Sequence, residues 1–338
     1  MSTITLTIDG YREISVPMGS SAEEIFIQSG MEQEWGTSTH PFPPVAALVN
    51  NELAALSAPV NADCKIAPIY PDSPMGAEVY RHSLCFLLAM AAKAIVPKRR
   101  LIVSMAIGNG YYHYFDDEEP VSPHLLNSLC LYMRDIVAKN LTIRIIMQSW
   151  NSVFEYFEQS NQAETFSLME YINDPFVLLN ECQDYKDLHI APLVPRTGLL
   201  SVWELMPYRR GMLLRFPHTK KPYEMDPFID IPVLYDIAEE YEQKAKVLNA
   251  GSIGALNKIN QSGGIQDFIL MAEALQNKKL AAIADMIAEK SDKTKVILIA
   301  GPSSSGKTTT AKKLSVQLRA LGFKPIHIEL DNYFVDRS

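Results

Sequence analysis

Cysteine is scarce in this chain of 338 residues, and its four cysteines lie far apart in the sequence. They are Cys64, Cys85, Cys130 and Cys182, and no two of them form a CxxC pair. Disulfide frameworks and structural zinc sites both need paired or closely spaced cysteines. We therefore expect free thiols in a reducing compartment.

Long hydrophobic runs are also missing. The longest, residues 84–96, is too short to cross a bilayer and is interrupted by Lys93, so we expect a buried helix there. The first ten residues, MSTITLTIDG, alternate polar and apolar side chains and lack the apolar centre of a signal peptide. These absences predict a soluble, cytoplasmic protein that does not enter a membrane.

Basic residues are almost absent from the N-terminal quarter of the chain. Residues 1–80 hold two basic and ten acidic side chains, whereas the whole chain holds 31 basic and 39 acidic ones. Sequence-independent binding to nucleic acid needs clustered Lys and Arg that neutralise the phosphates. We therefore expect no DNA partner. Residues 292–338 hold eight basic and four acidic side chains, an excess that suits a polyanionic ligand.

The pattern of polar and apolar residues predicts two α+β domains followed by helices. Residues 3–8 and 12–16 alternate at period two around Asp9-Gly10, which is typical of a β-hairpin. Apolar residues at helical spacing predict a helix over 121–139. We assign four regions: an α+β domain at 1–70, a second α+β domain at 75–228, a helical connector of three helices at 229–291, and the start of an α/β domain at 292–338.

The strongest motif is GPSSSGKT at residues 301–308, which satisfies G-x-x-x-x-G-K-[ST]. It follows an expected buried strand at 295–300 and opens a helix over 307–321. Such a loop and helix N-terminus point N–H groups at a phosphate, Lys307 reaches the β- and γ-phosphates of ATP, and the Thr308 hydroxyl completes the Mg²⁺ shell. The expected phosphate-binding residues are Gly301, Ser303, Ser304, Ser305, Gly306, Lys307, Thr308 and Thr309. The alternative is a Gly- and Ser-rich turn that binds no ligand.

A second expected strand, residues 325–330, ends at Asp331. Ligands of doubly wound sheets bind beyond the carboxyl ends of the strands. We therefore expect Asp331 to face the phosphate site, where its carboxylate accepts a proton from an attacking hydroxyl. The alternative is a turn aspartate that caps the next segment.

The loop GPSSSGKTT, together with LDNYF at residues 330–334, resembles the uridine kinase and phosphoribulokinase group of P-loop kinases. The resemblance implies that Asp331 contacts the ribose of a nucleoside and serves as the catalytic base, while Lys307 and Mg²⁺ offset the charge of the transferred phosphate. Such a fold needs more parallel strands than the two expected here. We therefore expect a truncated kinase domain that shows no turnover on its own.

Three stretches in the first two thirds of the chain carry a second resemblance. They are Arg81-His82-Ser83 at the start of a helix, GNGYY at 108–112, and DLHIAPLVPRTG at 187–198. Residues 1–228 resemble the two N-terminal domains of threonyl-tRNA synthetase on these stretches. The resemblance implies a TGS-type β-grasp fold for residues 1–70 and an editing-type fold for residues 75–228.

In that family an HxxxH pair on the helix and a CxxxH pair in the downstream loop form one site that hydrolyses mischarged tRNA. The corresponding pairs here are His82 with Phe86 and His189 with Leu193. The apolar replacements can neither bind a metal nor relay a proton. We therefore expect a degenerate pocket in which His82 and His189 remain as polar groups for binding or packing. The alternative is that editing chemistry survives.

The leading hypothesis from these patterns is an ATP- and Mg²⁺-dependent kinase that phosphorylates a nucleoside hydroxyl. The synthetase-like domains then have a binding or regulatory role. The alternative is a nucleotide-gated module that binds tRNA or another RNA without kinase turnover. The expected partners are a nucleoside substrate and, at the degenerate pocket, a tRNA-like or small-molecule ligand.

Overall fold

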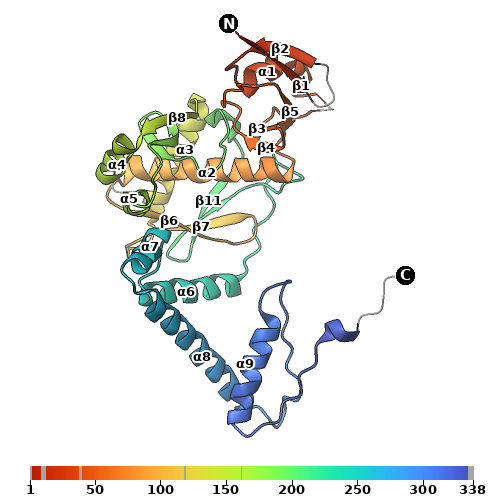
Figure 1. Cartoon of the computed structure of the whole chain (residues 1–338), viewed down its shortest axis with the longest axis vertical. Helices are drawn as coiled ribbons and strands as arrows, with labels where there is room; N and C mark the ends of the chain where they lie inside the picture. The colour runs from red at the N-terminus through yellow and green to blue at the C-terminus, as the bar shows by residue number, and fades with distance from the viewer. Residues whose placement is uncertain (1, 9–12, 38–39, 118, 161, 334–338) are drawn as a thin grey trace. The chain divides into compact units, whose positions relative to one another are not determined.

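The structure of the chain is a computed structural model with several sheets and a mixed α+β architecture. It describes residues 2–8, 13–37, 40–117, 119–160 and 162–333, without the side chains of residues 331 and 332. The chain divides into two compact units, unit 1 (Met1–Gln243) and unit 2 (Lys244–Ser338), and each is treated by itself (Figure 1).

Unit 1 begins with a five-stranded mixed sheet. Its elements are β1 (Thr3–Ile8), β2 (Glu13–Pro17), α1 (Ala22–Gln28), η1 (Met31–Glu34), β3 (Ala46–Val49), β4 (Glu52–Ala54) and β5 (Cys64–Ile69). The strand order is β2-β1-β5-β3-β4, in which β1 and β5 are parallel and the other neighbours antiparallel. The pairing of β1 with β2 confirms the predicted hairpin, although its turn at Asp9-Gly10 lies outside the described residues.

Alternation and capping explain these first elements. In β1 the threonines are exposed while Ile4, Leu6 and Ile8 are buried, because successive side chains of a strand point to opposite faces. Helix α1 starts with a capping box: the Ser21 hydroxyl accepts from the Glu24 N–H at 3.2 Å, and the Glu24 carboxylate accepts from the Ser21 N–H at 2.8 Å. The helix thereby presents its apolar face to the sheet.

The rest of unit 1 is built around a long helix, α2 (Pro74–Ile95). The other elements are β6 (Leu101–Ala106), β7 (Gly110–Phe115), α3 (Pro123–Lys139), β8 (Arg144–Ser149), α4 (Trp150–Gln159), α5 (Ala163–Met169), β9 (Phe176–Cys182), β10 (Tyr185–Leu188), η2 (Thr197–Leu199), β11 (Glu204–Tyr208) and β12 (Gly211–Arg215). They form two further sheets in the described residues, ordered β10-β9-β8 and β11-β12-β7-β6. The helices expected at 84–96 and 121–139 are confirmed as parts of α2 and α3.

Helix α2 is the centre of the largest apolar core (Figure 1). Its first turn lies directly against the end of β5, since a Cβ on Gly76 would stand 2.0 Å from the carbonyl oxygen of Tyr70. Further along, twelve of its residues are buried, and α3, β10 and β12 pack on them. The helix therefore connects the N-terminal sheet with both later sheets.

The aromatic run at 111–115 lies in β7, and four of its five residues are buried in the core. His113 in this strand has no exposed surface. Its Nδ1–H donates to the Tyr111 carbonyl at 2.9 Å, and its Nε2 has no hydrogen-bond partner among the described residues. Burial lowers the pKa of His113 to about 4, so its imidazole is neutral in the folded chain at neutral pH.

His113 therefore makes the stability of unit 1 pH-dependent. Its pKa rises from about 4 in the folded chain toward 6.5 on unfolding, so its contribution is complete above pH 6.5 and is lost as the pH falls toward 4. Between pH 7 and pH 5 the free energy of unfolding should fall by about 2 kcal/mol on this account. Urea unfolding of the wild type and of His113→Phe at both pH values tests this. Equal losses in the two proteins would contradict it.

Three helices follow, as expected for the connector at 229–291: α6 (Pro232–Val247), α7 (Ile253–Gln261) and α8 (Ile265–Glu289). Unit 2 continues with α9 (Lys307–Ala320) and the short turn η3 (Leu330–Tyr333). Helices α8 and α9 pack through a small cluster formed by Leu280, Ala284, Leu314 and Leu318.

The prediction of strands at 295–300 and 325–330 is wrong. Neither stretch forms a strand, and Leu298 and Ile326 are 86% and 87% exposed. A strand needs a neighbour to pair its backbone groups, and the described part of unit 2 offers none. The α/β kinase domain expected from residue 292 onward is therefore not confirmed.

No helix in the described residues is long and apolar enough to span a membrane.

Candidate functional site

The helix residues expected at the degenerate pocket come from one face of α2. Ser73 caps this helix, its hydroxyl accepting from the Gly76 N–H at 3.1 Å, and Pro74 occupies the first turn. His82 and Phe86 are four residues apart and so lie on the same side of the helix. His82 is exposed, whereas Phe86 is only 6% exposed and belongs to the apolar core.

The second pair follows the hairpin of β9 and β10. The backbone N–H of His189 donates to the Leu178 carbonyl at 3.0 Å, and its ring Nδ1 lies 2.9 Å from Oδ1 of the buried Asn180. Because that amide oxygen can only accept, Nδ1 carries the proton and Nε2 keeps a lone pair. Burial lowers the pKa of His189, which favours this neutral ring.

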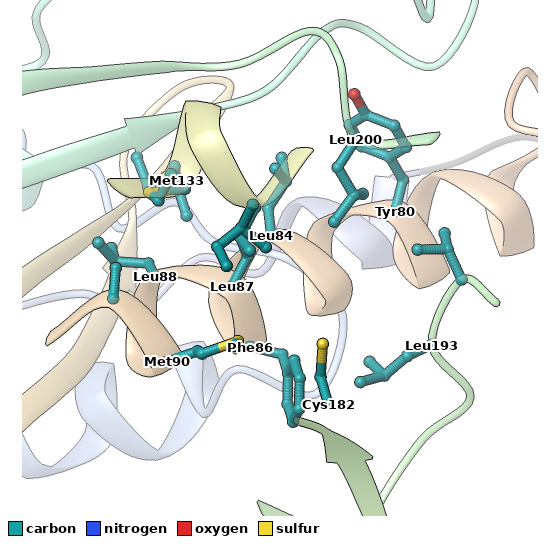
Figure 2. Close-up of a cluster of buried hydrophobic side chains, with 14 of the residues drawn as sticks. Tyr80, Leu84, Phe86, Leu87, Leu88, Met90, Met133, Cys182, Leu193 and Leu200 are labelled. Carbon is teal, nitrogen blue, oxygen red and sulfur yellow. The ribbon is translucent and has the colours of Figure 1, made fainter. Parts of the chain in front are cut away.

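The two replaced positions lie together in the core. Figure 2 shows Phe86, Cys182 and Leu193 grouped beside α2, and all three belong to the same apolar cluster. The Phe86 ring meets the Tyr185 ring edge-on, with 5.1 Å between the centroids. The chain thus brings the HxxxH-like and CxxxH-like segments together, but with an apolar contact where the resemblance implies polar groups.

Ser83 fixes the position of the second segment, and sequence reasoning missed it. Its hydroxyl donates to the Val79 carbonyl one turn earlier at 2.6 Å and accepts from the Val194 N–H at 2.9 Å. Ser83 is fully buried, and the second bond joins residues 111 positions apart. It holds the loop after Leu193 against α2.

No thiol near the pocket is set up as a nucleophile. Burial raises the pKa of Cys182 to about 11 and that of Cys85 to about 12, so both remain protonated at neutral pH. No group of three or more His, Cys, Asp or Glu side chains that could hold a metal ion occurs in the described residues. His189 and the exposed His82 can therefore donate or accept hydrogen bonds, but the described residues offer neither a thiolate nor a metal-binding group that would activate a water.

The loop at 301–308 adopts a turn that starts helix α9. Ser304 and Gly306 have positive φ values of 60° and 80°, and Gly306 precedes the helix without a side-chain cap. The Lys307 ammonium donates to the Pro302 carbonyl at 2.7 Å, so it folds back over the loop. Thr308 and Thr309 are exposed in the first turn of α9.

Asp331 lies in the turn η3, and its side chain is outside the described residues. The predicted approach of this carboxylate to the phosphate loop stays a prediction. The remaining expected loop residues, Gly301, Ser303 and Ser305, lie in the same exposed turn as Ser304.

The loss of the bond between Ser83 and Val194 should destabilise unit 1. In Ser83→Ala the buried Val194 N–H keeps no partner, which should lower the free energy of unfolding by about 1–3 kcal/mol. Urea unfolding followed by tryptophan fluorescence measures the change.

Ser128→Ala is the matched control for this substitution. The Ser128 hydroxyl also donates one turn back, to the His124 carbonyl at 3.0 Å, but it is on the exposed side of α3 and receives no hydrogen bond from another segment of the described chain. We expect a change below about 0.5 kcal/mol there. Equal effects of the two substitutions would show that the loop contact is unimportant.

Comparison with known proteins finds a likeness over part of the chain. No protein-family model matches. Among curated proteins, the threonine–tRNA ligase of Magnetococcus marinus is 32% identical over 165 residues, 48% of this chain and 25% of the ligase. That of Desulfovibrio desulfuricans is 32% identical over 156 residues, 46% of the chain and 24% of the ligase. That of Desulforamulus reducens is 28% identical over 209 residues, 61% of the chain and 31% of the ligase.

These matches support the synthetase-like resemblance for part of the chain, which spans a quarter to a third of the length of these ligases. They contradict the hypothesis of a nucleoside kinase. The curated relatives reported are tRNA ligases, and none of them is a uridine kinase or another phosphotransferase. The kinase activity, the nucleoside substrate and the role of Asp331 as its catalytic base therefore lose their support.

Proposed function

We propose that residues 1–228 form a tRNA-synthetase-related binding module that receives the 3′ end of a tRNA, with or without its amino acid, and does not hydrolyse the ester. The observation that carries the proposal is the combination at one pocket. The segments that resemble threonyl-tRNA synthetase meet there, joined by the bond from the Val194 N–H to the Ser83 hydroxyl, while Phe86 and Leu193 fill two positions with apolar side chains.

The remaining polar groups suit binding. The Nε2 lone pair of His189 can accept a hydrogen bond from a ribose hydroxyl or an amino group, because Asn180 holds the proton on Nδ1. His82 is exposed on α2 and can take part from the helix side. Phe86 and Leu193 supply an apolar wall.

The same groups do not suit hydrolysis. Ester cleavage needs a positioned base and a water, and each lost acid or base typically costs about 10²–10⁴-fold in rate. Phe86 and Leu193 remove one partner from each pair. A lone imidazole then has no neighbour that holds a water for attack.

The charge distribution limits the partner to a chain end. Duplex nucleic acid is held mainly through its phosphates by Lys and Arg. Residues 1–80 contain only two basic side chains against ten acidic ones, so this region gives little affinity for the body of a tRNA. The β-grasp likeness of the first sheet, in which β1 and β5 run parallel beside α1, is part of the same proposal.

The purified chain should bind but not deacylate Ser-tRNA(Thr). We expect the ester to be lost at the uncatalysed rate. Acid precipitation of labelled seryl-tRNA at successive times measures this loss. Hydrolysis well above that rate, and abolished in His82→Ala or His189→Ala, would contradict the proposal.

Binding is measured separately, by the anisotropy of a labelled acceptor-stem RNA. His189→Ala should weaken it about tenfold, because the hydrogen bond that Nε2 accepts from the RNA is lost. His124→Ala changes an exposed histidine on α3 and should leave the affinity unaltered. Equal affinities of all three proteins would remove His189 from the site.

A second candidate function is phosphate binding at residues 301–308. The turn fits the group: Ser304 and Gly306 already have left-handed backbone, and α9 begins without a side-chain cap on its first N–H groups. Residues that would hold a nucleotide are Gly301, Ser303, Ser304, Ser305, Gly306, Lys307, Thr308 and Thr309. Lys307 would contact the phosphates of ATP, and the Thr308 hydroxyl would face a bound Mg²⁺.

ATP binding to the whole chain tests this second candidate without any assay of turnover. Titration with a fluorescent ATP analogue and Mg²⁺ should saturate, and Lys307→Ala should weaken it at least about tenfold because a charge-assisted contact is lost. Lys312→Ala removes an exposed lysine of the same helix and serves as the control. Identical binding curves for the two variants would exclude the loop.

A further inference from the structure

A cleft of about 320 Å³ lies in unit 1 and is lined by neither His82 nor His189. Its walls come from the C-terminal half of α2, from β6, from the segment of α5, and from β10. The volume lies at the lower end of the range for sites that hold small molecules. Apolar residues form much of its surface, among them Ala89, Ala92, Leu101 and Tyr185.

Lys93 is the cation of this cleft that lacks a counter-charge. Its ammonium donates to the Ser160 carbonyl, and no carboxylate pairs with it in the described residues. Burial lowers its pKa, as expected for a half-buried ammonium without an anion beside it. Two of its three N–H donors remain for a ligand.

Asp187 is the corresponding acid. Its Oδ1 accepts from the Leu188 N–H at 2.9 Å, and its Oδ2 lies 3.5 Å from the Tyr185 hydroxyl. No cation pairs with it in the described part of the chain, and burial raises its pKa. A cation that binds beside such a buried carboxylate compensates its otherwise unpaired charge and so stabilises it.

The other charges of the cleft are already matched. Arg99 forms a bidentate ion pair with Asp117: its Nε donates to Oδ2 at 2.7 Å and its Nη2 donates to Oδ1 at 2.6 Å. Arg100 pairs with both Asp116 and Glu164. Lys93 and Asp187 are thus one positive and one negative group that line the same cleft without pairing with each other.

We propose that this cleft binds a free aliphatic amino acid, with its carboxylate at Lys93, its ammonium group at Asp187 and its side chain against Ala89, Ala92 and Leu101. A zwitterion supplies both missing charges with one small molecule. An aminoacyl ester has no free carboxylate, so this ligand is distinct from one held at His189. The inference is independent of the function proposed for the pocket at His82 and His189.

Calorimetric titration of the whole chain with L-leucine tests the inference, and two analogues test each charge separately. L-Leucinamide lacks the carboxylate, and 4-methylpentanoate lacks the ammonium group. We expect saturable binding of L-leucine and affinity at least about tenfold weaker for both analogues. No saturable heat with L-leucine or L-valine up to about 20 mM would overturn the proposal, as would equal affinity for L-leucine and either analogue.

Two variants place the ligand in the cleft. Lys93→Met keeps the length of the side chain and removes its charge, and it should weaken L-leucine at least about tenfold. Lys220→Met removes an exposed lysine outside the cleft and should change nothing. L-Leucine binding that is unaltered in Lys93→Met would overturn the assignment. Should Lys93→Met fail to fold, the two analogues on the wild type decide the question alone.

Discussion

The packing of one helix, α2, is the constraint on which unit 1 depends. Twelve of its residues are buried, and they contact the end of the first sheet, helix α3 and the strands of both later sheets. Each Å² of apolar area that these residues bury contributes about 25 cal/mol to the stability of the core. Polar exceptions on it are therefore informative. Ser83 is such an exception, and its hydroxyl joins α2 to the segment after Leu193.

The same packing explains why the pocket beside α2 differs from a hydrolytic site. Phe86 points into the core and meets Tyr185, so the position adds stability where a polar side chain would need partners. Leu193 does the same from the opposite segment. The His189 imidazole is held by Asn180, whereas Phe86 and Leu193 belong to the apolar core.

The sequence was a good guide wherever a pattern records what one element buries. The alternation of Ile4, Leu6 and Ile8 predicted β1, and the apolar face of 121–139 predicted α3. The run at 295–300 has an equally clear pattern, but a strand also depends on a partner, and none pairs with it in the described residues. The kinase hypothesis rested on that strand and on a short motif. The relatives of this chain contradict it.

The same distinction, between local patterns and contacts with distant residues, applies to the site residues. His82, Phe86, His189 and Leu193 could be located by motif. The motif also contains Ser83, but does not show its role, because its partner Val194 is 111 positions away. Asn180 could have been found from the sequence. In the hairpin of β9 and β10 it pairs with Asp187, two residues before His189, so it had to lie close to that imidazole.

The central claim is that His189 is a neutral, oriented acceptor in a binding pocket. Long-range ¹⁵N NMR of the imidazole tests it most directly, with a non-hydrolysable 3′-seryl-amino analogue of adenosine as the ligand. The account predicts a ring protonated on Nδ1 in the free chain and a saturable shift of the His189 Nε2 resonance on addition of the analogue. A ring protonated on Nε2, or a resonance that does not move at saturating analogue, would contradict it.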